Sequence, residues 1–330
     1  MRIKEILRRA SDAFGKGSRR LRMISLIILV AEILGVISAV DAVMNTRTSQ
    51  GAIAWAVSLV TFPYVAVPAY WVLGRSEFRG YVQAHRIADL AIDPAIEEAV
   101  SVAEQFRFER PTGPYPASAA EALAAVPTLR GNSVQLLVDG QETFDSIEEG
   151  IRSAEEYILF QFFIVKDDGL GRRMQKALIE RARAGVRVYF LFDEVGSHAL
   201  SRQYQDELRE AGVEVFNFHT RQGPSNRFQI NFRNHRKIVV VDGRATWIGG
   251  HNVGDEYMGK GKLGYWRDTH VRIDGPAAVA AQLSFVEDWN WATGRLPEVD
   301  WIPDPAPDGG DVPVLILPTG PADDFESAAP

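Results

Sequence analysis

One segment in the last third of the chain gathers residue types that can act on a phosphate group. His235 and Lys237 lie two positions apart at the start of an apolar run that is predicted to be a strand. Side chains alternate along a strand, so both point to one face and can contact one ligand. Asp242 ends the run, and a returning strand leads to a glycine pair that includes Gly250 and then to Asn252. Glycine lets the backbone approach a ligand closely, and the Asn252 amide adds a donor.

This combination suits phosphoryl chemistry. An imidazole can attack phosphorus, while a cation and amide donors stabilise charge on the non-bridging oxygens, so no metal ion is required. The alternative interpretation is a surface hairpin with a basic face, which would be commonplace for His-x-Lys alone. The whole combination is more specific than that pair.

An alternating series of strands and helices must position these residues. We expect strands at 134–138, 157–165, 186–193, 213–218, 237–241 and 245–248, and helices at 142–154, 170–184 and 201–211. Strands separated by helices of this length indicate parallel pairing. The prediction is therefore an α/β domain with a mixed, largely parallel sheet flanked by helices.

Two apolar runs precede this domain. Residues 23–44 are broken only by Glu32 and Asp41, and residues 51–73 contain no charge. Each run has about the 20 residues needed to cross a bilayer, so we expect two transmembrane helices, the second bent at its two prolines. Eight basic residues precede the first run and one lies between the runs, so both ends are expected in the cytoplasm.

The chain therefore divides into five parts. They are a basic cytoplasmic leader at 1–22, a two-helix membrane anchor at 23–73, a connector at 74–130, the α/β unit at 131–300, and a Pro-, Asp- and Gly-rich segment at 301–330 with one strand-like stretch at 312–317.

The composition limits the possible functions. The 330 residues contain no cysteine, which excludes disulfides and Cys-ligated zinc, and the six histidines show no metal-site spacing. Acidic residues number 43 against 36 basic ones, which gives no basic footprint for nucleic acid. We expect neither a cofactor nor a nucleic-acid partner.

The motif residues resemble the phospholipase D superfamily, whose pattern is H-x-K-x4-D followed by G-[GS]-x-N. Bacterial cardiolipin synthases are closer still. The similarity includes RTSQGAIAW at 47–55, GNSVQLLVDG at 131–140, NFRNHRKIVVVDG at 231–243 and GGHNVGDEY at 249–257. It runs from the first apolar run to the end of the chain.

The resemblance implies a reaction between two phosphatidylglycerol molecules that gives cardiolipin and glycerol, in an inner membrane of anionic phospholipid. His235 would be the nucleophile that forms a phosphatidyl-histidine intermediate. Lys237 and Asn252, with the Gly250 backbone, would hold the phosphate oxygens, and Asp242 would orient or tune the site.

The chain departs from the family in one respect, because the family uses two such motifs and this chain has one. The second histidine would protonate the departing glycerol. None of the other five histidines has a lysine two positions on. We expect a C-terminal half with the second motif to be missing, or a homodimer partner to supply it; residues 301–330 would be a linker or the start of that half.

Three alternatives stay open. A hydrolytic phospholipase D would use water as the acceptor. A phospholipase D-type nuclease is disfavoured by the apolar runs and the acidic balance. A catalytically inactive half-enzyme would serve as a membrane-bound interaction module.

Overall fold

The computed structural model describes most of the chain, and the chain divides into two units. The described residues are 19–46, 49–74, 97, 100–109, 120–121, 124, 126–218, 234–261, 264 and 266–319. The first unit comprises Met1–Gly80 with Arg221–Phe232, and the second comprises Tyr81–Thr220 with Arg233–Pro330. The predicted leader and much of the predicted connector lie outside the described residues.

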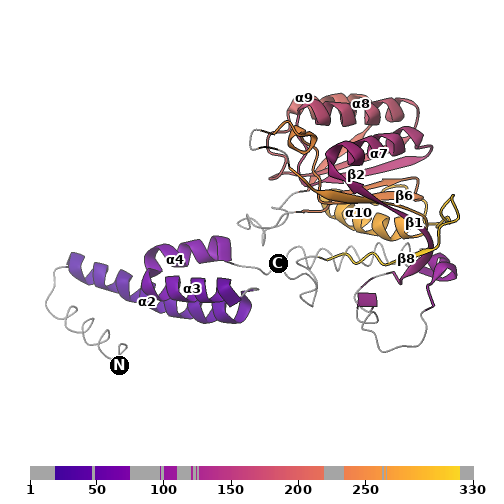
Figure 1. Cartoon of the computed structure of the whole chain (residues 1–330). Coiled ribbons are helices and arrows are strands. Elements are labelled where there is room, and N and C mark those ends of the chain that lie inside the picture. The colour runs from indigo at the N-terminus through magenta and orange to yellow at the C-terminus, as the bar shows by residue number, and fades with distance from the viewer. Residues whose placement is uncertain are drawn as a thin grey trace. The chain divides into compact units, whose positions relative to one another are not determined.

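The first unit is helical. It contains α2 (Arg19–Asn45), α3 (Ser49–Thr61), α4 (Pro63–Ala69) and a short π-helix, η1 (Tyr70–Gly74). Within the described residues, one helix is long and apolar enough to cross a membrane, at Arg22–Asn45. The prediction of a second spanning helix at 51–73 is wrong, because Phe62 leaves the helical conformation and Pro63 starts a separate helix. Figure 1 shows α3 and α4 side by side along α2.

The second unit is built on one sheet of eight strands in the order β4-β3-β2-β5-β6-β7-β1-β8. The strands are β1 (Leu129–Val138), β2 (Tyr157–Phe162), β3 (Arg187–Asp193), β4 (Glu214–Phe218), β5 (Ile238–Val241), β6 (Ala245–Gly249), β7 (Thr269–Asp274) and β8 (Val312–Val314). The helices are α7 (Asp139–Ser153), α8 (Gly169–Arg183), α9 (Arg202–Glu210) and α10 (Ala277–Thr293), with short 3-10 turns η2 (Glu104–Phe106) and η4 (Asp255–Met258).

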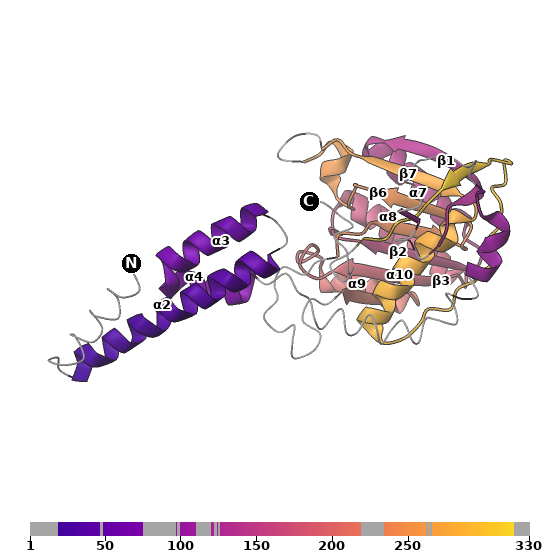
Figure 2. The same cartoon turned by 90° about the horizontal axis from the view of Figure 1, so that it is seen from below.

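Helices cover both faces of this sheet. Figure 1 shows α7, α8 and α9 on one face and α10 on the other, and Figure 2 shows α10 lying across the strands. The larger core lies under α7 and α8, where Trp247 and Phe160 are fully buried. On the opposite face, Trp289 of α10 packs edge-on against Tyr189 and Phe216. The two burial patterns differ because successive strand residues point to opposite faces.

The sheet is mixed, as predicted, but the expectation of largely parallel pairing is wrong. Only β2–β3 and β3–β4 are parallel, and the other neighbouring pairs are antiparallel. Helix α7 connects β1 to β2, but β5, β6 and β7 lie between these two strands in the sheet. A helix between two strands in sequence therefore does not make them neighbours in space.

The predicted strands and helices of this unit are present, most with small shifts at their ends. Strand β2 ends at Phe162, three residues before its predicted end. Helix α10 was not predicted because it is buried on nearly every side, so its sequence lacks the polar stripe of a surface helix. Strand β8 pairs with β1, and the Ala306 amide donates to the Gly131 carbonyl, so residues 301–319 pack on this same unit.

Candidate active site

His235 and Lys237 lie on one face, as the alternation predicts. They come immediately before β5 rather than on it. The His235 ring stacks on Phe163, with ring centroids 3.9 Å apart, and the Lys237 ammonium lies 5.4 Å from the centre of the same ring. Lys237 Nζ also donates to the His235 carbonyl at 2.5 Å. His235 is exposed, so an imidazole and a cation meet at the surface over one aromatic ring.

The residues that alternate with this pair point to the opposite face and hold the segment. The Asn234 side chain donates to Asp288 of α10 at 2.6 Å, and Arg236 donates to the same carboxylate oxygen at 2.9 Å. Gln161 of β2 donates to it as well, at 2.8 Å. Asp288 is 1% exposed, so this is a buried carboxylate with three donors. Removing this carboxylate would take a shared acceptor away from Arg236 and from two buried amide groups.

Asp193 holds the same segment from another strand. It ends β3, and its carboxylate accepts from the Asn234 backbone amide at 2.9 Å. Its other oxygen accepts from the amides of Val195 and Gly196 at 2.9 and 2.8 Å. The carboxyl end of a parallel strand thus positions the backbone next to His235.

The loop after β2 carries Phe163 and is fixed from two sides. Ser197 donates to the Phe163 carbonyl at 3.1 Å and accepts from Val165 at 2.9 Å. The Asn252 side-chain oxygen accepts from the Ile164 amide at 3.0 Å. The ring that supports His235 therefore has little freedom to move.

Asn252 lies beneath the site rather than on its surface. It is 5% exposed, and its amide nitrogen donates to the Tyr257 hydroxyl at 3.1 Å. One amide hydrogen remains for a ligand, since the group carries two. In this structure Asn252 joins the loop after β2 to η4.

Gly250 is required by a close approach. A Cβ at this position would overlap the carboxylate of Asp268, and the Gly250 amide donates to Thr269 at 3.0 Å. The turn therefore brings backbone and an acidic side chain close together beside the motif.

Burial and nearby carboxylates have opposite effects on the pKa of Lys237, and burial has the larger effect. Burial lowers the pKa of Lys237, while the carboxylates of Asp268 and Asp193 act in the opposite direction. A cation that has lost part of its hydration interacts more strongly with an incoming phosphate oxygen. Asp268 is not among the site residues that the sequence predicted.

Behind the turn lie two buried histidines. His251 Nδ1 and His270 Nδ1 are 3.2 Å apart, and both side chains are at most 1% exposed. Burial lowers the pKa of His251 and lowers that of His270 to about 3. Both rings are therefore neutral at pH 7, and they fix the turn between β6 and β7.

Asp242 is not brought together with His235 and Lys237. It follows the far end of β5, and five residues of extended chain span roughly 17 Å. Its carboxylate accepts from the backbone amides of Glu155, Glu156 and Tyr157 at 2.8, 2.9 and 2.8 Å. Its contacts tie the start of β2 to the end of β5.

Three polar or aromatic residues that follow the motif in sequence have partners outside it. Glu256 opens η4 and forms an ion pair with Lys166 at 2.6 Å. Trp266 packs edge-on against Tyr257 and is 43% exposed. Arg267 lies 3.8 Å from Asp139. None of these three contacts involves the imidazole of His235.

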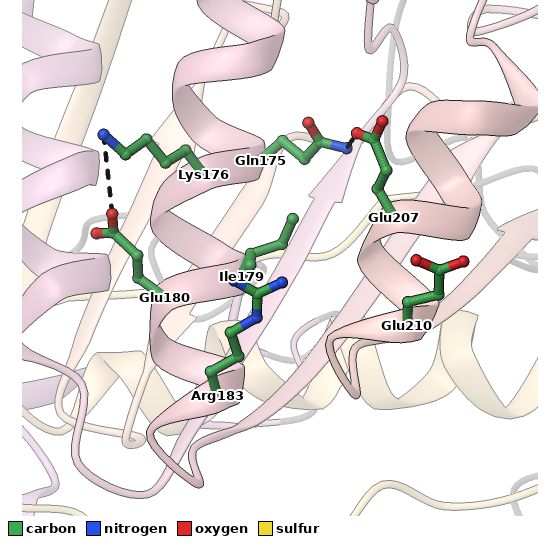
Figure 3. A pocket seen from close by; sticks show the side chains of 7 residues that line it. All are labelled: Gln175, Lys176, Ile179, Glu180, Arg183, Glu207 and Glu210. Carbon is green, nitrogen blue, oxygen red and sulfur yellow. Dashed lines mark hydrogen bonds and ion pairs between the residues drawn. The ribbon is translucent and has the colours of Figure 1, made fainter.

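A shallow pocket lies elsewhere on this unit. It has a volume of about 360 Å³ and lies on α8 and α9, with no motif residue in its lining. Figure 3 shows Gln175 turned toward Glu207, and Lys176 paired with Glu180. Four of the lining side chains are thus paired with one another. Among the described residues, no three His, Asp or Glu side chains are grouped to hold a metal ion.

The sequence of each unit matches a known family model. Residues 147–284 match the family described as "Cardiolipin synthase, PLD-like domain", and residues 33–75 match "Phospholipase_D-nuclease N-terminal". The α/β unit is therefore similar to phospholipase D-like domains.

Over most of its length the chain is also similar to proteins named cardiolipin synthase A. It is 47% identical to "Cardiolipin synthase A" of Pseudomonas fluorescens Pf-5 over 92% of this chain and 64% of the relative. It is 44% identical to "Cardiolipin synthase A" of Pseudomonas aeruginosa PAO1 over 93% of this chain and 63% of the relative. The chain thus spans less than two thirds of these relatives. A solved phospholipase D family member, Nuc from Salmonella typhimurium, is 20% identical with a TM-score of 0.39, over 51% of this chain and 99% of that chain.

Proposed function

We propose that the chain is a phosphatidyltransferase that acts as a cardiolipin synthase. His235 attacks the phosphorus of one phosphatidylglycerol, and glycerol leaves. The free hydroxyl of a second phosphatidylglycerol headgroup then attacks the phosphatidyl-histidine, giving cardiolipin and free His235. One phosphodiester replaces another in the overall reaction, so no external energy source is needed, and covalent catalysis divides it into two comparable steps.

The observation that carries this proposal is the placement of His235. It is exposed at the surface, stacked on Phe163, and next to a half-buried lysine. Lys237 can pair with a non-bridging oxygen, and the Gly250 turn and the remaining Asn252 amide hydrogen lie nearby in the same loop cluster. Asp242 acts through the backbone, because its bonds fix the strand that carries the motif.

The leaving glycerol needs a proton, and the described residues offer no second histidine for it. His251 and His270 are buried against each other, and His198 contacts the Val195 carbonyl. We therefore propose that a second phospholipase D-like unit supplies the general acid, either in a longer chain like those of the relatives or in a second copy of this one.

The membrane supplies both substrates in this proposal. Helix α2 carries exposed apolar side chains along its length, including Met23, Ile27, Ile37 and Val40. We propose that it anchors the protein in the bacterial inner membrane, where anionic phosphatidylglycerol is presented to the site.

A test that does not depend on turnover is capture of the intermediate. The full chain in detergent-lipid micelles with phosphatidylglycerol should acquire a phosphatidyl adduct on the peptide that contains His235. His235→Ala should abolish the adduct, and His198→Ala is the matched control because this exposed histidine lies outside the site. The proposal would be refuted if no adduct formed on the parent chain alone and none formed on a longer chain that includes a second phospholipase D-like unit.

The products separate the remaining candidates. Cardiolipin and glycerol indicate transfer, and phosphatidic acid and glycerol indicate a hydrolytic phospholipase D. Specific binding to anionic lipid without any adduct indicates an interaction module.

A further inference from the structure

The path of residues 49–74 along α2 is inconsistent with a second crossing of the membrane. Helix α3 begins shortly after α2 ends and runs back along it, so that Gly35 faces the Leu59 carbonyl and Pro63. The chain then turns around again. The Tyr70 hydroxyl donates to Asp41 at 2.7 Å, and Trp71 donates to Ser38 at 3.1 Å.

These contacts fix the direction of the last segment. Tyr70 lies level with Asp41, four residues before the end of α2, and packs edge-on against Trp55 of α3 at 5.3 Å. A straight helix from residue 49 to residue 74 would have carried Tyr70 to about the level of Ile24, near the opposite end of α2. The segment instead enters and leaves at the same end of α2.

The backbone groups described at the turn of Phe62 and Pro63 are paired within the chain, so this turn is compatible with an apolar environment. Phe62 has φ −133° and ψ 56°, outside the helical region, and its carbonyl accepts from the amides of Val65 and Ala66 at 3.1 and 2.9 Å. Pro63 has no N–H to satisfy, which removes one of the free donors of a helix start. Backbone groups in hydrocarbon must be paired internally, and this turn meets that requirement for the bonds described.

The hairpin has an apolar tip and a polar mouth. Its tip exposes Phe62 and Val65, which are 69% and 74% exposed. Its mouth holds the hydrogen bonds of Asp41, which also accepts from Asn45 at 2.8 Å. Thirteen residues of α3 rise about 20 Å, less than the roughly 30 Å of a bilayer core. The tip lies beside Gly35, close to the middle of the span Arg22–Asn45.

We infer that residues 49–74 form a re-entrant hairpin seated among the acyl chains of one leaflet, the leaflet that surrounds the C-terminal half of α2. The chain then crosses the membrane once. The phospholipase D-like unit leaves the membrane on the side opposite the basic leader. The leader has eight basic residues and stays on the cytoplasmic side, so the unit faces the periplasm. This replaces the expectation of a cytoplasmic domain, which required two crossings.

The absence of cysteine makes the test direct, because each introduced cysteine is the only one in the chain. Three single variants are compared in intact cells with a membrane-impermeant maleimide: Ser11→Cys in the leader, Thr48→Cys between α2 and α3, and Lys176→Cys on an exposed side chain of α8. Each is repeated after permeabilisation to show that the thiol is reactive.

The inference requires Thr48→Cys and Lys176→Cys to react in intact cells and Ser11→Cys to react only after permeabilisation. Labelling of Thr48→Cys with protection of Lys176→Cys would mean two crossings and would overturn it. Protection of both, with labelling of Ser11→Cys, would overturn the assigned orientation.

A distance measurement tests the hairpin without reference to side. Nitroxides on Thr46→Cys and Val72→Cys of the full chain in vesicles should lie within about 20 Å of each other. A second crossing would separate them by about 30 Å or more, the thickness of the bilayer core. Neither measurement depends on phosphatidyl transfer, so this inference can fail while the proposed function stands.

Discussion

Replacing Asp242 distinguishes a residue that touches the substrate from one that holds the sheet. Asp242→Ala removes three hydrogen bonds that backbone amides donate to a carboxylate. Bonds to a charged group contribute about 1.5–3 kcal/mol each, but two of the three donors belong to the exposed residues Glu155 and Glu156, where water can replace the acceptor. We therefore expect a loss of about 3 kcal/mol from these bonds.

The backbone adds to this cost. Asp242 has φ +51°, in the left-handed region, which Ala adopts less readily than Asp or Asn by about 1 kcal/mol. The total for Asp242→Ala is about 4 kcal/mol. Asp242→Asn keeps one acceptor oxygen and the favourable backbone, so it should cost about 1–2 kcal/mol. At about 2–4 °C per kcal/mol for a domain of this size, the Tm falls by about 8–16 °C and about 2–8 °C respectively.

The assay is thermal unfolding of the full chain in detergent, followed by tryptophan fluorescence, with phosphatidyl transfer or adduct formation measured per folded molecule below both transitions. Asp304→Asn is the matched control, because Asp304 is an exposed carboxylate that Arg244 contacts at 2.9 Å. Its effect should stay within about 0.5 kcal/mol. An Asp242→Asn variant with an unchanged Tm and a rate at least 100-fold lower would refute the reasoning, since the carboxylate would then act on the substrate.

Further predictions concern the site and its support. Phe163→Ala should lower adduct formation at His235 by about 3- to 10-fold, since an aromatic pair contributes about 0.5–1.5 kcal/mol, and Phe163→Tyr should retain most of it; equal rates in all three would contradict the stacking role. Gly250→Ala should reduce adduct formation more than tenfold, because the new Cβ would overlap the Asp268 carboxylate. Unchanged kinetics would show that Asp268 can move aside without disturbing the site. Stability should fall with acidification, because the folded-state pKa values of His251 and His270 lie below the unfolded value of about 6.5 and the second is about 3. That contribution is complete above pH 6.5 and is lost as pH falls from 6.5 toward 3, by up to about 1.4 kcal/mol per pH unit and histidine; urea midpoints at pH 7.5 and 5.5 measure it, and His198→Gln should leave the slope unchanged.

The sequence predicted the shared face of His235 and Lys237, but it did not predict the residues that support them. The shared face of His235 and Lys237 follows from the pleat of an extended chain, which is a local property. Phe163, Asp193 and Asp288 come from three other elements, and no spacing rule connects them to the motif. The alternation of Asn234 and Arg236 with the motif pair was a usable signal, because two polar side chains on the inward face need buried partners.

The membrane segment shows a different limit. Hydropathy records how many apolar residues follow one another, and both runs were found correctly. It does not record where the chain reverses direction. Pro63 indicated a bend, but the reversal depends on Tyr70 and Trp71 reaching Asp41 and Ser38, contacts that the composition of either run does not reveal.

The buried hydrogen bonds on either side of His235 also bear on the cost of reaching the transition state. Since Asn234 and Arg236 both donate to Asp288, the backbone around His235 has already lost its conformational entropy when the protein folds. If the proposed function is right, a lipid headgroup that reaches the site meets a preorganised imidazole, and its binding energy is not spent on ordering the segment around His235.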